Sequence, residues 1–409
     1  MMQSVDVVII GGGMVGLALA AALKESDLRI AVIESHVAND QLTPLPDVRV
    51  SALSRSSEIV LRNLNAWSGI VARRAAPYQA MEVWEQDSFA RIEFNADAMM
   101  QPNLGHIVEN RVIQLALLEQ VKQQANVALH VPATCQSIAI GESEAWLTLS
   151  NGQAFSAKLV VGADGAHSWL RHQMNIPLTH WDYGHSALVA NVRTREAHQQ
   201  VARQIFTAQG PLALLPMSDP HLSSMVWSTE PSRAEALLNM SAAQFNRALT
   251  AEFDARLGLC EVVGERQVLP LKMRYARDFV APRVALVGDA AHTIHPLAGQ
   301  GVNLGLLDAA SLAQELLSVW QQNRDIGELR HLRHYERWRK AEAAKMIAAM
   351  QGFRDLFAGD NPAKKLIRGI GMHLVGQLPG AKHEIMQRAL GLKGDLPELA
   401  KQVWLERVY

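Results

Sequence analysis

The N-terminal segment carries the pattern that most restricts the fold of this chain. An apolar run over residues 5–10, typical of a buried parallel strand, is followed at once by Gly11, Gly13 and Gly16 in a G-x-G-x-x-G spacing. An Ala- and Leu-rich stretch that favours helix comes next, and a second apolar run ends in Glu34. This order of strand, glycine-rich turn, helix, strand and acid predicts a βαβ unit that binds a dinucleotide.

Each residue of this motif has a physical role in such a unit. Gly11 permits the tight turn, Gly13 lets the backbone approach a pyrophosphate, and Gly16 allows close packing of the helix on the strand. The helix N-terminus offers free N–H groups and positive potential to the phosphates. Glu34 is placed to accept hydrogen bonds from a ribose. The alternative, a glycine-rich turn without a ligand, leaves the flanking elements unexplained.

A motif far along the chain distinguishes FAD from NAD. Residues 283–287 predict another buried strand, and Gly288 and Asp289 follow it, at the strand end where ligands of open α/β sheets collect. A carboxylate at that place is suited to hold a ribityl hydroxyl in the middle of a flavin nucleotide. NAD needs no such second site, so the sequence predicts FAD.

The residues after Asp289 extend this prediction toward the flavin ring. Gly299 and Gly301 would let the backbone lie against a flat ring, and a helix is predicted to begin at Val302 and Asn303. The positive end of that helix would stabilise negative charge on the pyrimidine edge of the reduced flavin.

A mid-chain motif, Asp164-Gly165, follows a predicted strand over 158–161 and precedes a predicted helix over 169–174. Its turn would bring the chain close to the pyrophosphate. The alternative is an ordinary Asp-Gly turn, which is common when it stands alone.

The three motifs resemble those of the single-component aromatic-ring hydroxylases, the p-hydroxybenzoate hydroxylase-like flavoprotein monooxygenases. The resemblance covers most of the chain. It is greatest to the ubiquinone-biosynthesis hydroxylases and, among these, to the bacterial 2-polyprenylphenol hydroxylases. The segments that carry it are residues 49–53 (RVSAL), 105–110 (GHIVEN), 181–183 (WDY) and 285–296 (ALVGDAAHTIHP).

This resemblance implies an α/β fold, with a Rossmann-like FAD-binding domain of the glutathione reductase type interleaved with a β-sheet substrate domain, plus C-terminal helices. The expected ranges are 1–73, 106–180 and 276–350 for the FAD-binding domain, 74–105 and 181–275 for the substrate domain, and 351–409 for the helical region. The implied activity is hydroxylation of the aromatic ring of a polyprenylated phenol in ubiquinone biosynthesis. It would use molecular oxygen through a flavin hydroperoxide, with NAD(P)H as the electron donor.

The resemblance also assigns roles to two arginines. In the family, an arginine at the position of Arg49 lies near the flavin and ribityl chain, and one at the position of Arg111 faces the adenosine and phosphates. A planar guanidinium suits phosphate and carbonyl groups. For Arg111, a solvated helix start is the alternative.

Catalytic groups are expected in the loop after the third motif. Pro296 would fix the local geometry, while Gly299, Gln300 and Gly301 would expose backbone N–H groups to the reacting ring. The titratable side chains near the expected substrate sheet that could activate the phenol are His185, Tyr183 and Tyr275, of which His185 is put forward.

Composition limits the other functions open to the chain. With 409 residues, 49% of them hydrophobic, it can bury the cores of two to three domains, and its net charge of −1 gives no general attraction to nucleic acid. Cys135 and Cys260 lie far apart and outside any C-x-x-C, which fits a reducing cytoplasm. Two H-x-x-H spacings lack the third ligand of catalytic zinc, so no metal is expected.

Two other functional classes stay open. A flavin oxidase or dehydrogenase would share the FAD fold without hydroxylating its substrate, and a hydroxylase could act on another aromatic compound. A NAD-binding or scaffold protein would keep the fold and lack the chemistry. A yellow protein with flavin absorption would exclude this last class.

Residues 363–375 mix basic and bulky apolar residues at helical spacing. Such a helix can lie on an anionic membrane, where a prenylated substrate resides, so we expect peripheral contact with the inner membrane or a biosynthetic complex. The alternative is a helix packed on the FAD domain or in a homo-oligomer. Leu212, Leu214, Leu215 and Met217 are expected to line an apolar substrate tunnel, with plain core packing as the alternative.

Overall fold

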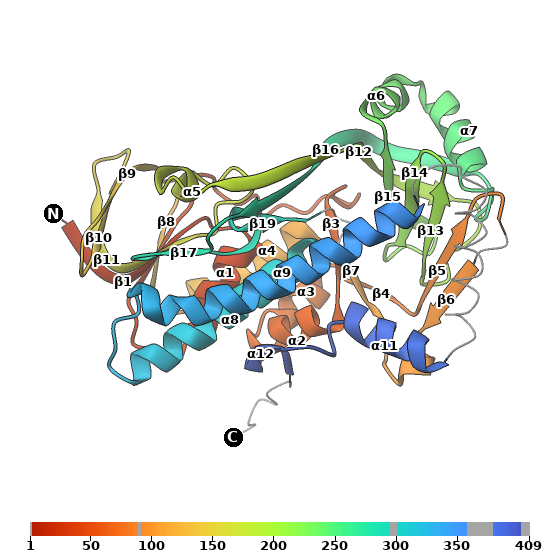
Figure 1. Ribbon diagram of the computed structural model, residues 1–409. Helices are drawn as coiled ribbons and strands as arrows, with labels where there is room; N and C mark the ends of the chain where they lie inside the picture. Colours follow the sequence, from red (N-terminus) through yellow and green to blue (C-terminus); the bar gives the residue numbers. More distant parts are fainter. Residues whose placement is uncertain (1, 89–90, 295–300, 358–378, 402–409) are drawn as a thin grey trace.

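The computed structural model describes residues 2–88, 91–294, 301–357 and 379–401, and these form three β-sheets surrounded by helices (Figure 1). The first sheet has the order β17-β18-β11-β1-β2-β8, with β10 paired to β11 and β9 to β10. Its strands are β1 (Met2–Ile10), β2 (Ile30–Ile33), β8 (Val127–His130), β9 (Cys135–Ile140), β10 (Ala145–Leu149), β11 (Ala154–Gly162), β17 (Val280–Ala281) and β18 (Val284–Leu286).

The centre of this sheet is parallel, as the sequence predicts. β1 pairs in parallel with β2 and β11, and β11 pairs in parallel with β18. Val7, Val8 and Ile9 are fully buried, because β1 is a central parallel strand whose side chains are covered on both faces. The packing helices include α1 (Met14–Ala22) and α4 (Asn110–Lys122). Strands from three separated parts of the chain thus end at one sheet edge.

The second sheet has the order β19-β16-β12-β15-β14-β13-β5-β6. Its strands are β5 (Ala80–Glu85), β6 (Arg91–Asn95), β12 (Leu178–Thr194), β13 (Val201–Thr207), β14 (Gly210–Pro216), β15 (Leu222–Thr229), β16 (Cys260–Ala276) and β19 (His292–Thr293). Strands β14 and β15 form an antiparallel hairpin, in which Leu212 pairs with Trp227. The long strands β12 and β16 reach back toward the first sheet (Figure 1).

Helices α6 (Pro231–Asn239) and α7 (Ala242–Glu252) cover one face of the second sheet. The second of these, α7, begins with a capping box at Ser241. It ends at Glu252 because Asp254 and Ala255 adopt positive φ values of 52° and 47°, which a right-handed helix does not allow.

A small third sheet lies between the other two and has the order β3-β7-β4. It consists of β3 (Val50–Leu53), β4 (Ala76–Tyr78) and β7 (Gly105–Glu109), with α2 (Arg55–Asn63) and α3 (Trp67–Arg73) joining its strands. β3 follows Arg49, and β7 leads directly into α4 and Arg111. The two predicted arginines therefore lie at one end of this sheet.

The C-terminal part is helical. α8 (Gly301–Gln321) packs on α1, and α9 (Leu329–Phe357) crosses the molecule from the first sheet to the second (Figure 1). α11 (Pro379–Ala389) places Met386 against Leu215 and Met217, and α12 (Glu398–Lys401) packs on α2. The predicted membrane-binding segment 363–375 lies outside the described residues. In the part of the chain that is described, no helix is long and apolar enough to span a bilayer.

Candidate functional site

The first and second glycine motifs meet at the carboxyl ends of β1 and β11. Ile10 lies opposite Gly162 in the sheet, and the N–H of Ala163 donates to the carbonyl of Ile10 at 2.8 Å. Gly11 has a φ of 110°, and a β-carbon there would overlap the carbonyl oxygen of Ala163. Only glycine fits this crossing of two chain segments, a contact that the sequence did not predict.

The turn after β1 leaves space for a ligand beside the N-terminus of α1. Gly13 is the N-cap residue, no side chain caps the helix, and its first turn contains no acid. A β-carbon on Gly13 would meet no atom within 4 Å, whereas one on Gly16 would overlap the carbonyl oxygen of Gly11. The uncapped N–H groups and the open space beside Gly13 fit a pyrophosphate, so this chain can accommodate FAD here.

Glu34 has a structural contact that the sequence did not show. Its Oε2 accepts from the N–H of Gly12 at 2.7 Å, and its Oε1 accepts from the N–H of His36 at 2.9 Å. On the other side of the turn, Nε2 of Gln114 in α4 donates to the carbonyl of Gly12 at 2.8 Å. Sequence reasoning missed Gln114, since only the fold brings α4 beside this turn. The predicted ribose contact of Glu34 stays a prediction.

The Asp164-Gly165 motif also holds an unused polar atom. Oδ2 of Asp164 accepts from the N–H of Leu170 at 3.1 Å, but its Oδ1 is buried and has no hydrogen-bond partner among the described residues. Gly165 has a φ of 79°, and nothing lies within 4 Å of the place where its β-carbon would be. A buried acceptor without a partner is costly, so a ligand that donates to Asp164 fits this position.

Asp289 lies in a short turn after β18, at the same sheet edge. Its side chain is accessible to water, yet burial raises its pKa, while His292, Arg49 and Arg274 act to lower it. Both observations are explained by a carboxylate that is recessed within the protein and faces an open space. Within the described chain, Asp289 accepts no hydrogen bond. It is therefore free to bind a hydroxyl.

The two predicted arginines have different surroundings. Arg49 is exposed, makes no side-chain hydrogen bond to a described residue, and favours the ionised form of Asp289. Arg111 is held by the loop before β3, with Nη2 3.2 Å from Oδ2 of Asp47 and Nη1 donating to the carbonyl of Gln41. Arg49 is thus available for a ligand, whereas Arg111 also fixes a loop.

The start of α8 connects the third motif to β3. Asn303 accepts from the N–H of Ser54 at 3.0 Å and donates to the carbonyl of Ala52 at 2.9 Å, and Val302 is buried beside it. Gly301 is exposed at the first position of the helix. Of the predicted catalytic loop, Pro296, Gly299 and Gln300 lie outside the described residues.

The three candidate bases are separated along the second sheet. His185 lies where β12 leaves its pairing with β16, near Gly210. Tyr275 donates to the carbonyl of Lys340 at 3.3 Å, and burial raises its pKa. The side chain of Tyr183 lies outside the described part. The role of His185 stays a prediction.

The residues proposed to line a tunnel are buried in two separate cores. Leu212 and Leu214 pack with Trp227 beneath α6 and α7, while Leu215 and Met217 pack against α11. Core packing, the alternative given for these positions, therefore describes them. A third apolar cluster lies on β12 and β16, the strands that lead to β19 and the third motif. Its Ala187, Val189, Leu271 and Met273 are themselves buried, and partly buried apolar side chains border them, including Val48, Trp181, Leu269, Tyr275 and Ile347.

A buried carboxylate in α8, Asp308, was also missed by the sequence analysis. Its Oδ2 lies 2.6 Å from Nε2 of His292, in the turn that carries Asp289. The signal was available, because an acid in the middle of an apolar helix needs a buried counterpart.

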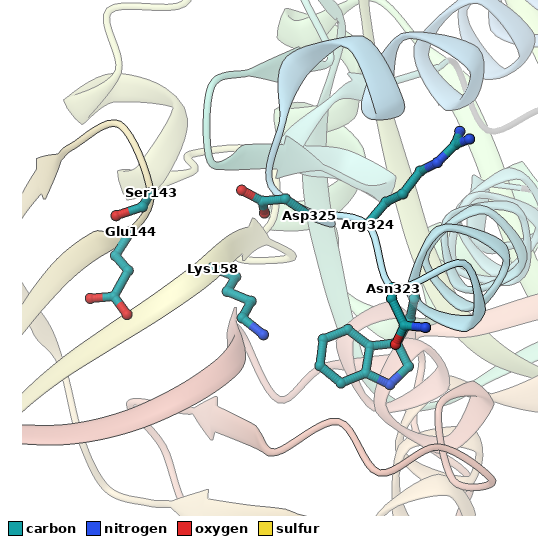
Figure 2. Close-up of a pocket in the computed structure, with 7 residues that line it drawn as sticks. Ser143, Glu144, Lys158, Asn323, Arg324 and Asp325 are labelled. Atoms are coloured by element: carbon teal, nitrogen blue, oxygen red, sulfur yellow. The ribbon is translucent and has the colours of Figure 1, made fainter.

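One surface pocket of about 430 Å³ lies elsewhere and is lined by charged residues (Figure 2). Its Lys158 is 3.0 Å from Asp6 and lies over the ring of Trp320, while its Asp325 pairs with Arg283 at 2.6 Å. Lys158 and Asp325 therefore already have partners. Asp6 lies in the middle of β1, so this pocket is away from the carboxyl edge where the three motifs meet.

A second pocket, of about 420 Å³, directly follows the Asp164-Gly165 motif. It is lined by His167, Ser168, Trp169, Arg171, His172, Ile176 and Leu178. The two imidazoles are exposed, whereas Arg171 is buried and donates to the carbonyls of Ala166 and Ala290. The pocket therefore offers polar groups beside the edge where the motifs meet.

Comparison with known proteins agrees with this geometry. Residues 4–350 match the family described as an FAD binding domain. The chain is 36% identical to the 3-demethoxyubiquinol 3-hydroxylase of Escherichia coli (strain K12), over 95% of this chain and 99% of that protein. It is 34% identical to the mitochondrial ubiquinone biosynthesis monooxygenase COQ6 of Homo sapiens, over 93% of this chain and 91% of that protein.

Solved structures show the same fold. The p-nitrophenol 4-monooxygenase PnpA of Pseudomonas putida DLL-E4 superposes with a TM-score of 0.78 at 20% identity, over 96% of this chain and all of that one. A ternary complex of aklavinone-11 hydroxylase with FAD and aklavinone superposes with a TM-score of 0.66 at 20% identity, over 85% of this chain and 68% of that one.

Proposed function

Since this chain belongs to the FAD binding domain family and is an FAD-dependent monooxygenase, we propose that it hydroxylates the aromatic ring of a polyprenylated phenol in ubiquinone biosynthesis. The observation that carries this proposal is the 36% identity, over nearly the whole chain, to an enzyme that hydroxylates a ubiquinone precursor. A 2-polyprenylphenol is the substrate we favour, on the sequence resemblance given above.

The residues that would hold FAD are those that meet at the carboxyl edge of the first sheet. Gly13 and the N-terminus of α1 would receive the pyrophosphate, Asp289 a ribityl hydroxyl, and Asp164 a donor of the nucleotide. When bound, FAD supplies the activation of oxygen. The protein orients the phenol, excludes water from it, and provides preorganised charges at the reacting centre.

The apolar surface on β12 and β16 suits a prenylated phenol. Ala187, Val189, Leu271 and Met273 present no polar side-chain group, and Val48 joins them from the loop that leads to Arg49. Strand β16 pairs with β19, which follows the turn of Asp289, so this surface continues toward the expected ring of the flavin. A polyprenyl tail would pack against the partly buried members of this cluster, Leu269 and Tyr275, and bury its methylene groups there at a gain of about 0.8 kcal/mol each.

The electron donor is proposed to be NAD(P)H. The pocket after Asp164-Gly165 has a volume within the range of ligand sites and presents His167 and His172 to solvent. Imidazoles can donate to the phosphates of a nicotinamide nucleotide. Replacing both histidines by Ala should raise the KM for NAD(P)H severalfold while FAD content stays at the wild-type level.

The proposal is tested with the FAD-loaded protein, a 2-polyprenylphenol, NAD(P)H and ¹⁸O₂. A hydroxylase inserts one labelled oxygen atom into the ring and releases the other as water. A flavin oxidase would instead release labelled hydrogen peroxide and leave the phenol unlabelled. Faster turnover of small polar phenols than of prenylated ones would show that the substrate class is wrong.

A further inference from the structure

The carboxylate of Asp308 holds both ends of the turn that carries Asp289. Its Oδ2 accepts from the N–H of Gly288 at 3.0 Å and lies 2.6 Å from Nε2 of His292. Its Oδ1 accepts from Nε of Arg339 in α9 at 2.7 Å. The side chains of Asp308, His292 and Arg339 are all at least 98% buried, so water does not compete for these bonds.

Asp308 is ionised despite its burial. Burial alone would raise its pKa, but His292 and Arg339 outweigh that effect, and the pKa lies below the usual value. An ionised carboxylate accepts at both oxygens, so His292 must donate through Nε2. A charge in the interior is tolerated only where donors replace its water, and Asp308 has three such donors.

These contacts converge on Asp289. Gly288 precedes it and His292 follows it by three residues, so fixing these two positions fixes the turn between them. The charges on Asp308 and His292 also act on the pKa of Asp289, in opposite directions. If Asp308 served only to join α8 to α9, its ion pair with Arg339 would be sufficient. The additional hydrogen bond from Gly288 indicates that Asp308 also holds the turn.

We propose that Asp308 is a positioning residue for FAD, which acts through Gly288 and His292 to aim the Asp289 carboxylate at the nucleotide. This inference rests on FAD binding at Asp289 and is independent of the aromatic substrate. Its test therefore needs no substrate, and its failure would leave the proposed hydroxylation intact.

The decisive variant is Asp308→Asn, compared with Asp6→Asn as a matched control. Asp6 is also a buried carboxylate with two cationic partners, Arg29 and Lys158, but it lies in the middle of β1, away from the carboxyl end where the glycine motifs meet. The apoprotein of each variant is titrated with FAD by flavin fluorescence. The visible spectrum and midpoint potential of the loaded proteins, and the Tm of the apoproteins, are measured alongside.

We expect Asp308→Asn to weaken FAD binding by ~10-fold or more and to shift the visible band and the potential, because an amide cannot accept from all three donors. Asp6→Asn should lower only the Tm. Wild-type affinity, spectrum and potential in a folded Asp308→Asn protein would overturn the proposal, whatever its Tm. An equal loss of affinity in Asp6→Asn would also overturn it, since general destabilisation would then explain both.

A second variant decides the question if Asp308→Asn does not fold. His292→Phe removes the N–H donor, while Arg339 continues to neutralise Asp308, and the new ring would lie beside Phe279, whose ring centre is 5.6 Å from that of His292. The proposal expects the same loss of FAD affinity and the same spectral shift. A His292→Phe protein that binds FAD as the wild type does would refute it.

Discussion

The carboxylate of Glu34 accepts a hydrogen bond from the backbone N–H of Gly12 at 2.7 Å, which ties the end of β2 to the turn after β1. Replacing Glu34 by Ala should weaken FAD binding by ~10–150-fold, since a charge-assisted hydrogen bond contributes about 1.5–3 kcal/mol. Glu34→Gln should lose less FAD affinity than Glu34→Ala, because the amide oxygen of glutamine can still accept a hydrogen bond from Gly12. Titration of the apoproteins with FAD measures both, with the exposed Asp40→Ala as a control that should bind normally.

Asp289→Ala should largely remove FAD, again by ~10–150-fold in affinity. The pH dependence gives a sharper check. Burial raises the pKa of Asp289, so its charge, and with it FAD affinity, should be lost at a higher pH than an ordinary Asp would allow. Asp289→Asn should bind weakly at every pH. An alanine variant that purifies with full flavin would remove Asp289 from the site.

The glycine motifs could be predicted because each depends on local spacing. A strand before Gly11 and a helix after it predict the tight turn at this glycine, whereas its close contact with Ala163 is set by the fold. The pair of Asp308 and His292 was not predictable in the same way, since it joins a helix to a turn that precedes it by 16 residues. Spacing within one element carries no information on such a contact.

The substrate surface was misplaced for a related reason. Alternate residues of a strand lie on opposite faces, so Leu212 and Leu214 had to face together, but the sequence does not say which face the flavin covers. The structure puts them beneath α6 and α7. The apolar surface nearer the third motif belongs to Val189 and Leu271, on strands whose pairing is set by the fold.

The buried carboxylate of Glu58 should make the free energy of unfolding depend on pH. It is buried beside His106, Arg55 and Arg62; burial opposes its ionisation, yet these partners lower its pKa to about 2. A carboxyl with a lower pKa in the folded state stabilises the fold above its unfolded value, and this contribution is lost as pH falls toward the folded value. The unfolding free energies of wild type and Glu58→Gln should therefore differ most above pH 4.5 and converge toward pH 2. The exposed Glu93→Gln should show no such convergence.

The segment 363–375 carries a prediction that rests on its sequence. Anionic vesicles should retain the wild-type protein at low salt, because Lys and Arg attract the lipid headgroups and the apolar residues insert beneath them. Lys364→Glu combined with Lys365→Glu should reduce the amount that co-sediments, and neutral vesicles serve as the control. If the double variant binds as well as the wild type, these lysines do not contact the membrane, and packing within the protein is the better interpretation.

Substitutions of Gly13 and Gly16 should have opposite effects: the first should abolish FAD binding without lowering stability, and the second should lower the stability of the apoprotein. A β-carbon on Gly13 would enter open space, and its φ of −79° suits any residue, so the apoprotein of Gly13→Val should keep its Tm. Its side chain would fill the place of the pyrophosphate, so FAD binding should be lost. Gly16→Ala would overlap the carbonyl of Gly11, and relieving that contact should cost the apoprotein about 1–3 kcal/mol of stability.

Met14→Ala is the control for these two variants, since Met14 is partly buried and packs on the core. It should retain more FAD than Gly13→Val when both are titrated as apoproteins. Equal FAD affinity in these two proteins would mean that the pyrophosphate does not lie at Gly13. A Gly13→Val apoprotein with a Tm as low as that of Gly16→Ala would mean that the space beside Gly13 is filled by the fold itself, which would leave the N-terminus of α1 without its ligand.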